Sequence, residues 1–165
     1  MRSITKLSLV VAALTLTGTA LQAQTNNASI NATASVQQPI NVVGFQALAF
    51  GNVFPGVNKT VAANDLTNAG RFDVTGQAST PVTISFTLPA TLNSAGNTMP
   101  IASYTGQSAL LNTGAGAVAF NPVVGTTTSL SGAGALFVWV GAQVQPATNQ
   151  AAGNYSGTIT MTVVY

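Results

Sequence analysis

The stretch Thr158-Ile159-Thr160-Met161-Thr162-Val163-Val164-Tyr165 alternates between polar and apolar residues. Successive side chains of a β-strand point to opposite faces of a sheet, so this period of two predicts a strand with one buried face. The apolar set comprises Ile159, Met161, Val163 and Tyr165. The intervening threonines are β-branched, which favours the same conformation.

The same period of two occurs in two further stretches of the chain. The apolar sets are Ile30, Ala32, Ala34 and Val36 in the first, and Val82, Ile84, Phe86 and Leu88 in the second. We also expect strands at residues 40–45, 47–53, 70–76, 117–120 and 136–144, separated by turns rich in glycine. No stretch after residue 23 keeps a helical period. The sequence therefore predicts an all-β protein with an antiparallel sandwich or barrel in one domain.

Residues 1–23 have the layout of a secretory signal peptide. Arg2 and Lys6 flank the start of an apolar stretch at 7–16, and Ala23 offers a small residue for cleavage. The apolar stretch is too short to span a bilayer as a helix, and a buried N-terminal helix is the alternative. We therefore expect an exported protein with a mature domain of residues 24–165 and no mature transmembrane helix.

Charge is scarce in this sequence. Four basic and two acidic residues make up all of it, and Arg2 and Lys6 would leave with the signal peptide. Lys59 and Arg71 then balance Asp65 and Asp73. Nucleic-acid binding and attraction to anionic lipids both need clustered basic residues, so we exclude both classes. A neutral surface of this kind favours self-association.

The side chains that enzymes use most are missing. The sequence has no histidine, no glutamate and no cysteine, so common general bases, thiolate nucleophiles and zinc ligands are absent. Asp65 and Asp73 are the two carboxylate side chains, and we interpret them as turn residues or partners of Arg71 rather than a catalytic pair. We expect no enzyme activity, no cofactor and no metal site.

Phe137 and Trp139 are the candidates for a ligand or subunit contact. They are two residues apart in an expected strand, so they share one face of it. An exposed aromatic pair could stack on a sugar ring or meet a neighbouring subunit. The alternative is that both faces of this strand are buried.

The run from Gly153 to Tyr165 resembles the ending of chaperone–usher pilins and of spore-coat-U-like proteins. It is still more similar to the family called domain of unknown function 4402. Further parts that fit this family are residues 32–42, Leu48-Ala49-Phe50-Gly51, Phe72-Asp73-Val74-Thr75-Gly76 and a glycine-rich stretch that leads into Leu136. In pilins a glycine precedes a near-terminal aromatic residue by twelve positions, and Gly153 and Tyr165 have that separation (165 − 153 = 12).

The resemblance implies an immunoglobulin-like, pilin-like sandwich whose C-terminal strand pairs with a periplasmic chaperone and later with a neighbouring subunit's N-terminal segment. The matching alternate set is Ile159, Met161, Val163 and Tyr165. Two features depart from pilins: the cysteine pair is absent, and residues 24–28 are too short for a donor strand unless 30–36 is itself donated. A self-complete sandwich therefore stays open.

We expect a non-enzymatic structural subunit of a pilus, fimbria or coat, assembled by β-strand complementation. The strand-pairing residues would be Ile30, Ala32, Ala34, Val36, Gly153, Ile159, Met161, Val163 and Tyr165. The alternatives are a small outer-membrane β-barrel and a self-complete adhesive or glycan-binding sandwich. Its location would be the periplasm, the cell surface or the medium of a Gram-negative-type bacterium.

Overall fold

The computed structural model describes residues 26–165, and the predicted signal peptide at 1–23 lies outside this range. The chain divides after Ser35, and the compact unit comprises Val36–Tyr165. Within the described residues every regular element is a strand. The strands are β1 (Asn41–Gln46), β2 (Lys59–Val61), β3 (Gly70–Thr75), β4 (Pro81–Thr87), β5 (Thr91–Ser94), β6 (Asn97–Ala109), β7 (Val118–Phe120), β8 (Thr126–Ser129), β9 (Ala135–Val144) and β10 (Thr160–Val164).

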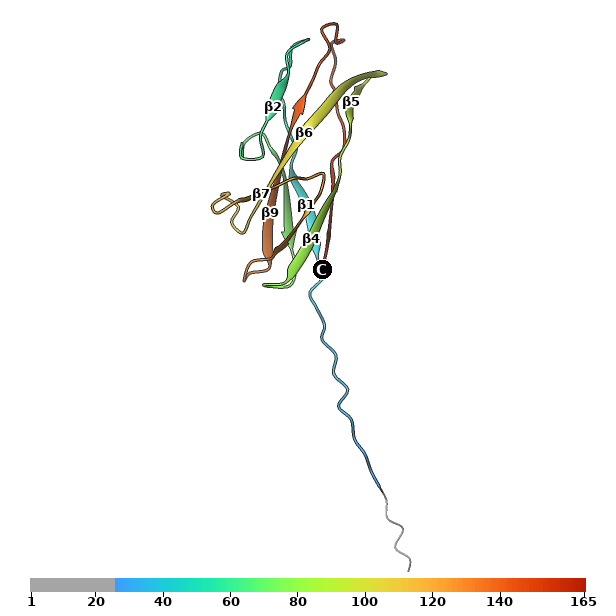
Figure 1. The fold of residues 1–165 in the computed structure, drawn as a ribbon, viewed down its shortest axis with the longest axis vertical. Helices are drawn as coiled ribbons and strands as arrows, with labels where there is room; N and C mark the ends of the chain where they lie inside the picture. Colours follow the sequence, from blue (N-terminus) through green and yellow to red (C-terminus); the bar gives the residue numbers. More distant parts are fainter. Residues whose placement is uncertain (1–25) are drawn as a thin grey trace, which may run out of the picture. The chain divides into compact units, whose positions relative to one another are not determined.

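The larger sheet has seven strands and is antiparallel throughout. Its order is β1-β3-β9-β6-β5, with β2 added to β9 and β7 added to β6. Strand β9 lies between β3 and β6, and β6 and β9 run side by side (Figure 1). The sequence of β9 is apolar over most of its length, which suits a strand that is buried on both faces.

The smaller sheet has three strands in the order β10-β4-β8. Its inner face places Val82, Ile84 and Met161 in the core, while the threonines and serines of β4 and β10 face outward. Val74, Leu136 and Val138 of the larger sheet pack against this inner face. The prediction of an all-β antiparallel sandwich is therefore confirmed, and so is the alternation of β4 and β10.

Two of the predicted strands do not form. Residues 30–36 have no regular secondary structure and are exposed, with Ile30 and Val36 at 94% and 95% exposure. Residues 47–53 belong to no strand either, although residues 47–50 alternate between exposed and half-buried positions and Val53 is half-buried again. In both stretches no neighbouring strand supplies ladder hydrogen bonds.

Four strands were not predicted: β2, β5, β6 and β8. The most important is β6, which runs for 13 residues and pairs with β9. Its register shifts between Ala102 and Thr105, and Ser103 has a positive φ of 50°. Such a bulge breaks the alternation of side chains, which is the reason that a period of two cannot reveal this strand.

Candidate functional site

An apolar groove of about 800 Å³ opens between two extended segments, residues 47–55 and 150–159. Its floor consists of Leu92, Met99, Ile101 and Val144. Met99, Ile101 and Val144 also form one of the three clusters of the hydrophobic core. The groove therefore gives access to the core of the sandwich between the edges of its two sheets.

The first wall of the groove is the segment 47–53, which continues β1. Its inward side chains are Leu48, Phe50 and Val53, all half-buried against the core clusters. Within the described part of the chain, this segment makes one backbone hydrogen bond, in which Ala49 N donates to Asn68 O at 2.8 Å. Most of its backbone groups thus have no strand partner, although its side chains are arranged as in a strand.

The second wall is the segment 150–159, which leads into β10. It meets β5 at a single antiparallel bridge, where Asn93 and Ser156 exchange two backbone hydrogen bonds of 2.8 and 3.1 Å. Gly157 suits this close approach, because a Cβ at this position would lie 2.8 Å from Leu92 Cδ2 and the leucine side chain would have to shift. Gly153 has the same role, since its Cβ would lie 2.6 Å from Ser94 Oγ. The predicted assembly residue Gly153 therefore lets the wall approach β5 closely.

Strand β10 continues the second wall and is an edge strand. It pairs with β4 alone, so one edge of its backbone lacks a ladder within the described chain. Of the predicted alternate set, Met161 is buried and Val163 is half-buried in the core, while Ile159 lines the groove. An unpaired edge next to an apolar groove is the arrangement that accepts an added strand.

The fourth member of this set, Tyr165, closes the end of the sandwich toward which β10 runs. Its hydroxyl accepts a hydrogen bond from Gln77 N at 2.7 Å and donates one to Gln38 O. Gln38 precedes β1 and Gln77 follows β3. Tyr165 therefore joins the end of β10 to the residues that flank the larger sheet, an attachment that the sequence alone did not indicate.

The predicted N-terminal assembly residues belong to no strand of the structure. Ile30, Ala32, Ala34 and Val36 are exposed and have no strand partner. This segment thus has an alternating apolar set but no strand paired with it. The edge of β10, next to the groove, is a sheet edge to which no further strand is paired.

The second predicted contact, Phe137 with Trp139, lies on the outer face of the larger sheet. The two residues do share a face, and their ring centroids are 6.4 Å apart. Trp139 is only 1% exposed, however, because Ala63, Ala69 and Ala109 pack over it. Of the two alternatives that the sequence left open for this pair, burial of both faces of the strand therefore holds at Trp139.

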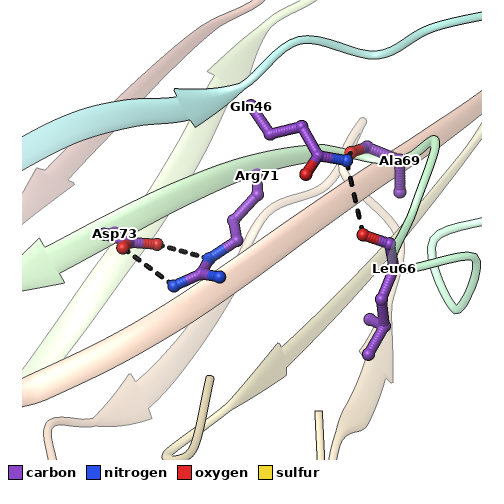
Figure 2. A network of polar contacts seen from close by, with 5 residues as sticks. All are labelled: Gln46, Leu66, Ala69, Arg71 and Asp73. Atoms are coloured by element: carbon purple, nitrogen blue, oxygen red, sulfur yellow. Dashed lines mark hydrogen bonds and ion pairs between the residues drawn. The ribbon is translucent and has the colours of Figure 1, made fainter. Parts of the chain in front are cut away.

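Arg71 lies over the same aromatic face. Its guanidinium carbon is 4.2 Å from the ring centroid of Phe45 and 4.9 Å from that of Phe137, within the range of cation–π contacts. Figure 2 shows this guanidinium in a bidentate pair with the Asp73 carboxylate, at 2.7 Å from Nε and 2.9 Å from Nη2. The charge of Arg71 is thus neutralised locally, in an otherwise apolar surface.

The other carboxylate, Asp65, holds a turn together. It accepts hydrogen bonds from Asn68 Nδ2 at 2.8 Å and from the backbone N of Thr67 and Asn68 at 3.2 Å. These bonds, led by the one from the Asn68 side chain, lower the pKa of Asp65 below its ordinary value. Gln46 Nε2 stabilises the same turn by donating hydrogen bonds to Thr67 O at 2.7 Å and to Ala69 O at 3.0 Å. Both carboxylate side chains therefore have structural partners.

Potential metal ligands do not gather in the described residues, where no three acidic, histidine or cysteine side chains lie together. Over residues 26–165 the structure also has no helix of the length and apolarity that crossing a membrane requires. The feature that stands out as a candidate site is the groove with the adjoining edge of β10.

The model of one protein family, described as domain of unknown function (DUF4402), matches residues 49–165 of the chain. The protein belongs to this family. The match covers the groove floor, the second wall and β10, so the proposed site of this DUF4402 protein lies mostly within the family's domain. A comparison with curated proteins found no match.

Proposed function

We propose that this DUF4402 protein is an exported, non-enzymatic structural subunit that assembles by accepting a β-strand. The observation that supports this most directly is the apolar groove between residues 47–55 and 150–159, continued by the unpaired edge of β10. A strand laid there would gain main-chain hydrogen bonds from the edge and would bury apolar side chains on the floor. The signal-like residues 1–23 support export.

The chain also contains a segment suited to fill such a groove. Residues 30–36 alternate apolar and polar, and both large apolar members, Ile30 and Val36, are more than nine-tenths exposed. Exposure of such side chains costs about 25 cal/mol per Å² of apolar surface, which favours their burial in a partner. We therefore assign the donor role to residues 29–36 of a subunit and the acceptor role to the groove.

The groove can be tested on the purified exported protein with a synthetic peptide that covers residues 27–38. A ligand of the folded state at a hundred times its Kd stabilises by about 2.7 kcal/mol, which raises the Tm by several degrees. We expect this peptide to raise the Tm and to dissociate existing oligomers, and we expect an Ile30→Asp peptide to do neither.

The donor segment can be tested in the full chain with a matched pair of variants. Val36→Asp places a charge in the predicted donor, while Val124→Asp places the same charge at another exposed valine, which is 82% exposed and far from the donor in sequence. We expect Val36→Asp alone to reduce the oligomers seen by light scattering. A wild-type chain that stays monomeric at high concentration, with a Tm that the peptide does not change, would contradict the proposal.

A further inference from the structure

We infer that Tyr165 is a specificity-determining residue for assembly, which keeps a subunit from filling its groove with its own N-terminal segment. This inference rests on the proposed function. Because the donor segment is tethered to the acceptor, its effective concentration in the same molecule is about millimolar, far above that of a second copy at low concentration. A subunit that polymerises this way needs a feature that disfavours the intramolecular product.

The lengths in the chain would permit that product. If residues 30–36 folded back along β1, residues 37–40 would form a loop of four residues, a common length for a β-hairpin. Strand β1 is at the edge of the larger sheet, so its outer edge is open to such a hairpin. Chain length therefore does not prevent self-completion.

The contacts of Gln38 oppose this hairpin, because Gln38 lies in the middle of the loop that it needs. Its carbonyl accepts the hydrogen bond from the Tyr165 hydroxyl, and its N–H donates to the Gln77 side chain at 3.2 Å. Both backbone groups are thus committed to the end of the sandwich. The Tyr165 side chain also passes from the end of β10 to the start of β1, across the end of the sandwich where the segment would turn back.

Chain direction is a second obstacle to self-completion. β10 runs toward Tyr165, and the N-terminal segment runs toward Gln38, which Tyr165 contacts. A segment that folds back from Gln38 would consequently run parallel to β10. For an antiparallel arrangement, Val36 would have to lie at the far end of a strand about 20 Å long, but the two residues to Gln38 span at most about 7 Å. A second copy has no such tether and can supply a strand that is antiparallel to β10.

The test uses the absence of cysteine from the chain. Ala34→Cys in the donor and Thr162→Cys, an exposed position of β10, form a single reactive pair that a short bismaleimide can link after purification, and each lies within four residues of the contact between Gln38 and Tyr165. Links within one chain and links between chains are then separated on a denaturing gel. In the otherwise wild-type chain we expect links between chains to predominate.

The decisive variant is Tyr165→Phe, which keeps the ring and removes the hydroxyl. Loss of a hydrogen bond of ordinary strength corresponds to about a fivefold change in an equilibrium, so we expect the share of links within one chain to rise about fivefold. The matched control is Thr80→Val, which also removes a hydroxyl that donates to a backbone carbonyl, here Ala78 O at 3.2 Å, and neither residue lines the groove. It should leave the ratio unchanged.

The outcomes separate this inference from the proposed function. If no link of either kind forms, the donor does not occupy the groove, and both proposals fail. If links within one chain predominate in the wild-type background, the groove is filled but Tyr165 does not direct assembly. An unchanged ratio in Tyr165→Phe also overturns the inference. If the Tyr165→Phe variant does not fold, the ratio of links within one chain to links between chains in the wild-type background still tests the inference.

Discussion

Strand β9 and the segment 47–53 both have side chains on the core, but they differ in their hydrogen bonding. β9 has neighbours along both edges, β3 and β2 on one and β6 on the other, and Val138 and Trp139 show that both of its faces are buried. The segment 47–53 has half-buried side chains on one face and one backbone hydrogen bond, from Ala49. Burial of a face and pairing of an edge are therefore independent properties of a strand-like segment.

This difference has a thermodynamic meaning. A buried strand with both edges paired contributes to the global stability of the domain, whereas a segment with few backbone bonds opens at a lower free energy. We expect β9 to set the stability of the isolated subunit and the segment 47–53 to set its capacity to assemble. The four predictions below are ordered by the size of the effect.

The largest effect is expected from Trp139→Ala in β9. The side chain is 1% exposed and packs against three alanines, so its removal leaves a cavity that the neighbours cannot fill. Such substitutions cost about 3–5 kcal/mol, and denaturant titration should show this loss in the midpoint. A loss below about 1 kcal/mol would mean that the centre of the sheet does not set the stability.

Leu48→Ala in the first wall should weaken peptide binding more than it lowers the stability of the monomer. Because Leu48 is only half-buried, we expect a loss of about 1–2 kcal/mol in the unfolding of the monomer, less than for a fully buried leucine. Binding of the 27–38 peptide should weaken at least tenfold in a fluorescence titration. Equal peptide affinity in Leu48→Ala and wild-type protein would remove this segment from the assembly surface.

The ionisation of Tyr104 measures how tightly the residues behind the groove floor are packed, since Tyr104 packs against the cluster of Met99 and Ile101. Burial raises the pKa of Tyr104 from 10.0 to about 12. The folded state therefore binds this proton more tightly than the unfolded state, and the resulting stability is lost as the pH rises from about 10 to 12. An absorbance titration should find a phenol that ionises near 12 in the wild-type protein, and Tyr104→Phe should lack this step.

The smallest effect concerns Asp65, whose turn supplies the carbonyl of Asn68 to Ala49. The pKa of Asp65 is lowered in the folded state, so its contribution is present above the ordinary value of 3.8 and is lost as the pH falls through the folded-state pKa. Below that pH we expect faster hydrogen exchange at Ala49, and Asp65→Asn should abolish this dependence on pH. Exchange at Val138 in β9 is the internal control and should not change.

The sequence predicts the strands whose period of two or continuous apolar run reflects a simple burial pattern, namely β1, β3, β4, β9 and β10, and it also predicts β7 within residues 117–120. It fails for β6, because Gly106, Gln107 and Ser108 occupy buried positions there and a bulge shifts the register. The sequence also predicts strands at 30–36 and 47–53, and neither forms. There it reports correctly on the side chains of 47–53 but says nothing about a pairing partner.

The candidate site was predictable only in part. Ile159, Met161 and Val163 were expected on one face, but their distribution between groove and core depends on how the second wall meets β5. Burial of Trp139 depends on small residues such as Ala63 and Ala69, which have no distinctive pattern in the sequence. The attachment of Tyr165 to Gln38 joins residues 127 positions apart, and no local pattern predicts such a contact.

None of the residues that line the groove is charged. Association at this site would lack electrostatic steering, so its rate constant should fall in the range of about 10⁵–10⁶ M⁻¹s⁻¹ that neutral partners reach. The same property removes the screening that weakens charged interfaces when salt is added. A polymer joined through this groove would therefore keep its strength over a wide range of ionic strength.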